Sequence, residues 1–141
     1  MPFLKFLVVT LLVWVLDAGG AQGSDLKVIA NPSVNVSSVS ADELKSIFLV
    51  TKTSLSSGGH VEPVLEKRGP THEAFLKEYL GKTEAALNTY YRSLVFTGKA
   101  FMPKMLGSDA EVAAYVAKTK GAIGYVNASA STPGAKTIAV R

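Results

Sequence analysis

The sequence predicts a single α/β domain. Short apolar, β-branched runs of strand length alternate with stretches whose apolar residues recur at helical spacing. Two S-x-x-E capping boxes, Ser40–Glu43 and Ser108–Glu111, mark helix starts directly before such stretches. The length of 141 residues suits one domain. The expected order of elements is β-α-β-α-α-α-β-β, which indicates strands and helices that share one core.

Strands are expected at four short apolar runs, and Pro63 within the second of them favours a sheet edge or a bulge. The polar segment Ser33–Val39 is expected to be an extended connection, and Lys99–Gly107 a loop. The four expected strands are Asp25–Asn31, Val61–Leu65, Ala122–Val126 and Lys136–Val140.

Four helices are expected, and glycines close three of them. The first runs from Ser40 to about Leu49, and the others begin near Thr71, Thr83 and Ser108. The third has the clearest 3.6-residue periodicity, so its apolar residues are expected to pack into the core. These residues are Leu87, Tyr90, Tyr91, Leu94 and Val95.

The first 21 residues predict a secretory signal peptide. Lys5 gives a weakly basic start, an almost uninterrupted apolar run follows at Phe6–Leu16, and small residues follow at 18–21. The apolar run is shorter than the roughly 20 residues that a membrane span needs. We therefore expect export and cleavage after Ala21, with an uncleaved membrane anchor as the alternative. Residues 25–141 are expected to form the folded domain.

Composition narrows the function classes. The chain has no cysteine, so disulfides and thiol chemistry are excluded. A net charge of +4 fits an anionic small molecule, an acidic membrane surface or no particular partner. No Lys/Arg run points to nucleic acid. His60 and His72 share no ligand motif with a carboxylate, and no nucleophile elbow or carboxylate pair stands out. We therefore expect no enzyme activity, no metal and no cofactor.

The stretch Leu65–Leu80 is the candidate binding site. Two basic residues run into Gly69-Pro70-Thr71, where a helix is expected to begin with threonine as a capping residue. Unpaired N–H groups and a partial positive charge at a helix N-terminus favour a small anion. The alternative is an ordinary strand–turn–helix junction, with His72 as a surface residue. The candidate ligand-binding residues are Lys67, Arg68, Gly69, Thr71 and His72.

Four segments, in the same order along the chain, resemble the phosphate ABC transporter substrate-binding proteins, which are type 2 periplasmic binding proteins. Tyr91–Gly98 is similar to a segment of short, single-lobe members. The other three segments are Ser40–Leu49 (SADELKSIFL), Gly69–Phe75 and Gly121–Tyr125 (GAIGY). The resemblance spans about Val28–Val126 and implies a three-layer α/β domain like one lobe of that family.

The resemblance also implies a function. In the family, an S-G-T turn at a helix N-terminus holds phosphate with an upstream arginine. This chain keeps Thr71, has Gly69 and Pro70 in place of serine and glycine, and has Leu65 at the arginine position. The implied protein is periplasmic, binds phosphate or a similar small anion, and works with an ABC permease or an envelope partner. The alternatives are an interaction or sensory module that lost the site, and a homodimer that rebuilds a two-lobe cleft.

Overall fold

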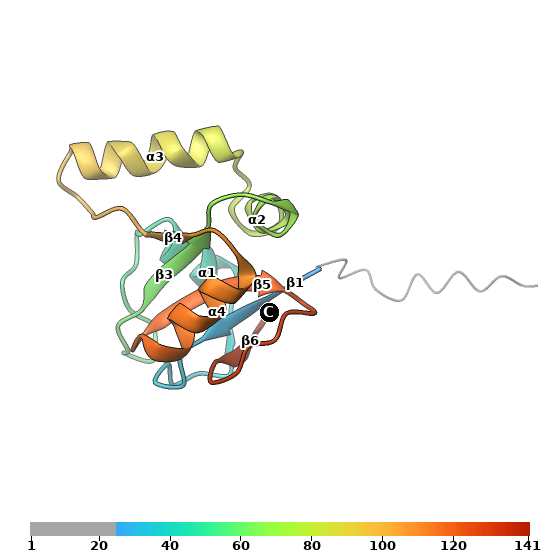
Figure 1. Ribbon diagram of the computed structural model, residues 1–141. Helices are drawn as coiled ribbons and strands as arrows, with labels where there is room; N and C mark the ends of the chain where they lie inside the picture. Colours follow the sequence, from blue (N-terminus) through green and yellow to red (C-terminus); the bar gives the residue numbers. More distant parts are fainter. Residues whose placement is uncertain (1–24) are drawn as a thin grey trace, which may run out of the picture.

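A computed structural model of the protein describes residues 25–141 (Figure 1). The predicted signal peptide and its membrane-anchor alternative lie outside these residues. One mixed sheet has the strand order β2-β6-β1-β5-β3-β4. Its strands are β1 (Leu26–Ala30), β2 (Ser38–Val39), β3 (Glu62–Glu66), β4 (Lys104–Leu106), β5 (Ala122–Asn127) and β6 (Lys136–Val140). The helices are α1 (Ala41–Phe48), α2 (Pro70–Phe75), the π-helical turn η1 (Leu76–Leu80), α3 (Glu84–Phe96) and α4 (Asp109–Lys118).

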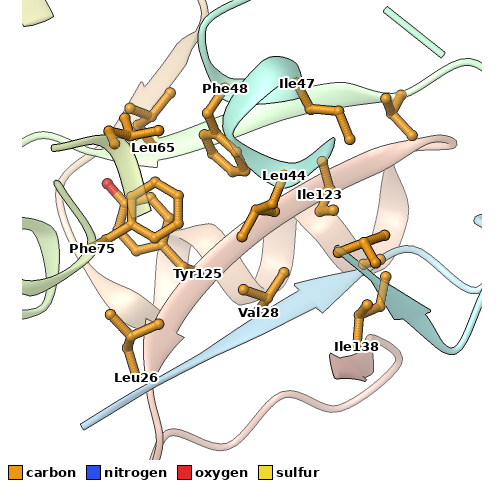
Figure 2. Packing of buried hydrophobic residues seen from close by; sticks show 14 of the residues in the cluster. Leu26, Val28, Leu44, Ile47, Phe48, Leu65, Phe75, Ile123, Tyr125 and Ile138 are labelled. Atoms are coloured by element: carbon orange, nitrogen blue, oxygen red, sulfur yellow. The ribbon is translucent and has the colours of Figure 1, made fainter. Parts of the chain in front are cut away.

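The sheet is the middle of three layers, which confirms the predicted fold class. Alternate residues of β5 point to opposite faces. Ala122 and Val126 pack with Val116 of α4 on one face, whereas Ile123 and Tyr125 join the larger core beneath α1, α2 and η1. Figure 1 shows α4 in front of the sheet, and Figure 2 shows the larger core on the other face. None of the helices within residues 25–141 has the length and apolar composition to cross a bilayer.

Two strands were not predicted. The segment expected to be a loop contains β4, and the segment expected to be an extended connection contains β2. Each forms by pairing with a distant strand, β4 parallel to β3 and β2 parallel to β6. With three and two residues, they are too short to show the two-residue alternation by which a strand is recognised.

The prediction that Pro63 marks an edge or a bulge was wrong, because β3 lies between β5 and β4. The Glu62 N–H donates to the Gly121 carbonyl on the β5 side at 2.9 Å. Since successive residues face opposite neighbours, the nitrogen of Pro63 faces the β4 side. Pairing with β4 begins only at Val64. The proline therefore occupies a position of an inner strand where no ladder bond is lost.

Helix α3 is anchored along only part of its length. The predicted cap is confirmed, because the Thr83 hydroxyl accepts the Ala86 N–H at 3.2 Å. Leu87 and Tyr91 are buried, and the Tyr91 hydroxyl donates to the Phe48 carbonyl. The predicted burial of Val95 was wrong, since it is exposed near the C-terminal end of the helix. The apolar stripe therefore continues beyond the last core contact of α3.

Gly121 lies where the chain leaves α4 and enters β5, with φ +78°. A Cβ atom there would lie 2.8 Å from the His60 carbonyl oxygen. We expect Gly121→Ala to lower the free energy of unfolding by about 2 kcal/mol or more, because it adds a clash to left-handed strain. Gly58→Ala is the matched control, since Gly58 also has a positive φ but no atom within 4 Å of a Cβ. If urea unfolding gave the same loss of stability for Gly121→Ala and Gly58→Ala, the contact with the His60 carbonyl would not be the cause.

Candidate functional site

The candidate site is the junction between β3 and α2. Strand β3 ends at Glu66, Lys67 and Arg68 are exposed, and α2 begins at Pro70. Gly69 is the N-cap residue with φ +105°, a conformation that favours glycine. The predicted helix start is thus confirmed. The predicted capping role of Thr71 was wrong, because it lies inside the first turn and the cap makes no side-chain hydrogen bond.

The first turn of α2 leaves two backbone donors without an intrahelical acceptor. The Glu73 N–H donates to the Gly69 carbonyl at 3.0 Å, so the N–H groups of Thr71 and His72 precede the first bond of the helix. Pro70 has no N–H. Thr71 alone among the five candidate residues lines a surface hollow of about 480 Å³ in the described part of the chain. The other lining residues are Asp25, Pro70, Ala74, Asn127, Ala128 and Ser129.

The side chain of His72 points into the protein. It is 2% exposed, so the expectation of a surface residue was wrong. Burial lowers the pKa of the imidazole, and the carboxylates of Glu84 and Glu73 act in the opposite direction. The ring is therefore neutral at neutral pH and brings no positive charge to the junction. Its backbone N–H stays at the start of α2.

Tyr125 of β5 ties the two sides of the junction together. Its hydroxyl accepts the Glu66 N–H at 3.1 Å and hydrogen bonds to Nδ1 of His72. Burial raises the pKa of the phenol well above its usual range. The phenol thus fixes the end of β3 and the start of α2 relative to β5.

A buried carboxyl group, Glu66, lies beside the basic residues and close to the partly exposed Asp109. Glu66 is 5% exposed, and its Oε2 atom has no hydrogen-bond partner among residues 25–141. Burial, and after it the neighbouring carboxyl group of Asp109, raises the pKa of Glu66 to about 8. The Oδ1 atom of Asp109 accepts the Asn127 N–H at 3.2 Å. At neutral pH Glu66 is therefore mostly protonated and adds little negative charge next to Lys67 and Arg68.

The sequence reasoning missed this pair and the tyrosine bridge. Asp109 was explained by its place in the first turn of a helix, and its contact with Glu66 was not foreseen. Glu66 ends β3, and Asp109 begins α4, 43 residues later along the chain. Only the pairing of β3 with β4 and β5 brings the two residues together. No local motif in the sequence signals that contact.

Leu65 lies at the position where the resembling family has its arginine. Its side chain is completely buried in the larger core, close to Phe48 and Phe75 in Figure 2. A leucine there adds to packing and provides no charge to the junction. The cationic side chains beside the start of α2 are those of Lys67 and Arg68.

Comparisons with known proteins support the fold. No protein-family model and no curated protein matches the chain. A phosphate ABC transporter substrate-binding protein from Clostridium perfringens, solved with bound phosphate, matches 82% of this chain and 44% of its own length at 15% identity and a TM-score of 0.64. PstS from Borrelia burgdorferi matches at 12% identity and a TM-score of 0.63, over 82% of this chain and 47% of its own length.

An ABC-type phosphate transport receptor from Vibrio cholerae gives a third match, with 15% identity and a TM-score of 0.54 over 82% of this chain and 45% of its own. The chain thus spans less than half the length of each of these three proteins. At these identities the likeness concerns the fold. The protein has the fold of a single lobe of a phosphate ABC transporter substrate-binding protein.

Proposed function

We propose that the protein is exported to the periplasm and binds phosphate or a related oxyanion at the start of α2. The observation that carries the proposal is the free N-terminus of α2, with two exposed cations beside it, on a scaffold shared with proteins named for phosphate transport. The contacts would be the N–H groups of Thr71 and His72, the Thr71 hydroxyl, and the charges of Lys67 and Arg68. Gly69 would let the backbone approach the anion closely.

The protonation of Glu66 supports an anion at this place. An ionised carboxylate there would repel an oxyanion and offset one of the two cations. Because burial and Asp109 raise the pKa of Glu66 to about 8, this repulsion is mostly absent at neutral pH. Lys67 and Arg68 are then the charged groups that directly follow the end of β3, whereas Asp25 lines the hollow beside Thr71.

Titration calorimetry with phosphate and with sulfate, at low and moderate salt, tests the proposal. We expect heat from phosphate that weakens as salt rises, because the two cations are exposed. Thr71→Ala removes the hydroxyl contact and is expected to weaken binding about tenfold. Lys120→Gln is the matched control for the Lys67→Gln and Arg68→Gln variants, since Lys120 is exposed near the opposite end of β3.

Each outcome has a distinct meaning. The absence of heat from any oxyanion would reject anion binding. Heat that Thr71→Ala leaves unchanged would reject this site while keeping the activity. Pro70→Ala returns one N–H to the first turn and is expected to strengthen binding.

The second candidate function is an interaction or sensory module of the cell envelope. Two observations favour it: Leu65 is buried where the resembling family has an arginine, and Pro70 removes a backbone donor. Under this alternative the fold is retained and the anion site is lost. Under the first proposal, anion binding would be coupled to one of two partners: an ABC permease, or a second copy of the chain that completes a two-lobe cleft. We expect a homodimer of the second kind to sediment as a larger species when phosphate is present.

A further inference from the structure

An apolar surface remains uncovered at the C-terminal end of α3. Phe96 is 92% exposed and Phe101 is 95% exposed, and both neighbours in the cluster, Val95 and Met102, are also exposed. We call these four residues the α3-tip surface. Figure 1 shows α3 at the upper margin of the molecule, beyond α2, with the following loop descending from its far end to β4. Two almost fully exposed phenylalanines on one small surface are typical of interaction sites.

The shape of this surface offers room for a contact. A hollow of about 640 Å³ is lined by Val95, Phe96 and Met102 together with Arg92 and Ser93. A second hollow of about 560 Å³ borders it and includes Phe101 and the loop that follows α3. The core contacts of α3 end at Tyr91 and Leu94, so the apolar tip is not needed to hold the helix in place.

Three cations surround the α3-tip surface. Arg92 lines the first hollow, and Lys99 and Lys104 line the second. Within residues 25–141 none of the three takes part in an ion pair. The one carboxylate in the second hollow, Glu62, accepts the Tyr115 hydroxyl at 3.2 Å. The Nζ atom of Lys104 lies over the Tyr115 ring, 5.4 Å from its centre. The rim therefore carries three cations and one carboxylate around an apolar centre, an excess of positive charge.

We propose that the α3-tip surface docks on an anionic lipid bilayer. Phe96 and Phe101 would enter the boundary between headgroups and acyl chains, where aromatic rings are favoured. Arg92, Lys99 and Lys104 would lie at the depth of the lipid phosphates, each strengthening binding by roughly fivefold. The proposal does not depend on anion binding at α2, because the two surfaces share no residue.

Charge favours a bilayer over a second copy of the chain. A symmetric dimer through the α3-tip surface would bring the three rim cations of one copy against those of the other, and like charges that face each other oppose association. An anionic surface instead neutralises all three cations at once. Apolar and cationic groups around one protruding tip match the two layers of a lipid interface.

Cosedimentation with lipid vesicles tests the proposal. The protein is purified from the periplasm of an expression host, and mass spectrometry determines its N-terminus. The probes are vesicles of phosphatidylcholine alone and vesicles that also contain phosphatidylglycerol. We expect binding to the anionic vesicles that falls with added salt. The double variant Phe96→Ser/Phe101→Ser should weaken it more than tenfold, and Arg92→Gln/Lys99→Gln at least tenfold.

Controls keep the test decisive. Lys118→Gln/Lys120→Gln removes two exposed cations beyond the α3-tip surface and should change vesicle binding little. Thr71→Ala with free inorganic phosphate present should leave binding intact, which separates lipid docking from the α2 site. Equal binding to neutral vesicles, binding that survives Phe96→Ser/Phe101→Ser, or no binding to either vesicle would overturn the proposal. A dimer in solution that the same variant dissolves would assign the surface to a second copy instead.

Discussion

Replacing Phe75 with alanine is expected to lower the free energy of unfolding by about 3–5 kcal/mol. Phe75 is completely buried and lies at the centre of the larger core. Its ring stacks on Tyr125 with centroids 3.9 Å apart and meets the Phe48 ring edge-on at 4.7 Å (Figure 2). Removing it opens a cavity between α2, α1 and β5, and that cavity cannot close without moving three elements.

Urea unfolding followed by circular dichroism measures this loss, and two variants act as controls. Phe75→Leu keeps most of the apolar volume and is expected to cost much less. Phe96→Ala deletes the same ring from an exposed position and should change stability by no more than about 0.5 kcal/mol. A loss for Phe75→Ala as small as that for Phe96→Ala would contradict the central place of Phe75.

Features that depend on near neighbours in the chain could be predicted. The serines of both capping boxes accept N–H groups three residues on, Ser40 from Glu43 and Ser108 from Glu111. A cap and an apolar stripe lie within one or two turns, so the sequence carries all the information. The short strands β2 and β4 have no such local pattern and depend on partners elsewhere in the fold.

At the candidate site, too, local features could be predicted and long-range contacts could not. The start of α2 was predictable because proline and glycine restrict the backbone locally. The burial of His72 was not, because it depends on the Tyr125 hydroxyl, 53 residues away along the chain. The exposure of Phe96 could not be predicted either, because its neighbours in the sequence are apolar. Only the fold shows that α3 extends beyond its last contact with the core.

Glu66→Gln is expected to change how stability depends on pH. The pKa of Glu66 is about 8 in the folded protein and 4.5 in its ordinary state. The folded state therefore holds a proton that the unfolded chain releases. This contribution to stability is complete below about pH 4.5 and is lost as the pH rises to about 8. The loss is at most about 1.4 kcal/mol for each pH unit. Above pH 8 the native protein must bury a charged Glu66 beside Asp109.

Glutamine has nearly the same shape as glutamic acid and cannot ionise at any pH. The free energy of unfolding of Glu66→Gln should therefore rise relative to that of the parent as the pH rises, by on the order of 2–4 kcal/mol at pH 9. Burial lowers the pKa of His72, which makes stability rise with pH in the range where free imidazole titrates. The two proteins share this trend, so their difference at each pH isolates Glu66.

Urea unfolding from pH 5 to pH 9 gives that difference directly. Asp25→Asn, which removes an exposed carboxylate at the start of the described chain, should run parallel to the parent. A constant gap between Glu66→Gln and the parent would mean that Glu66 is ionised across the whole range. An ionised Glu66 would then lie directly before Lys67 and Arg68 and would weaken their attraction for an anion. The stability curve and the phosphate titration thus test one protonation state by independent measurements.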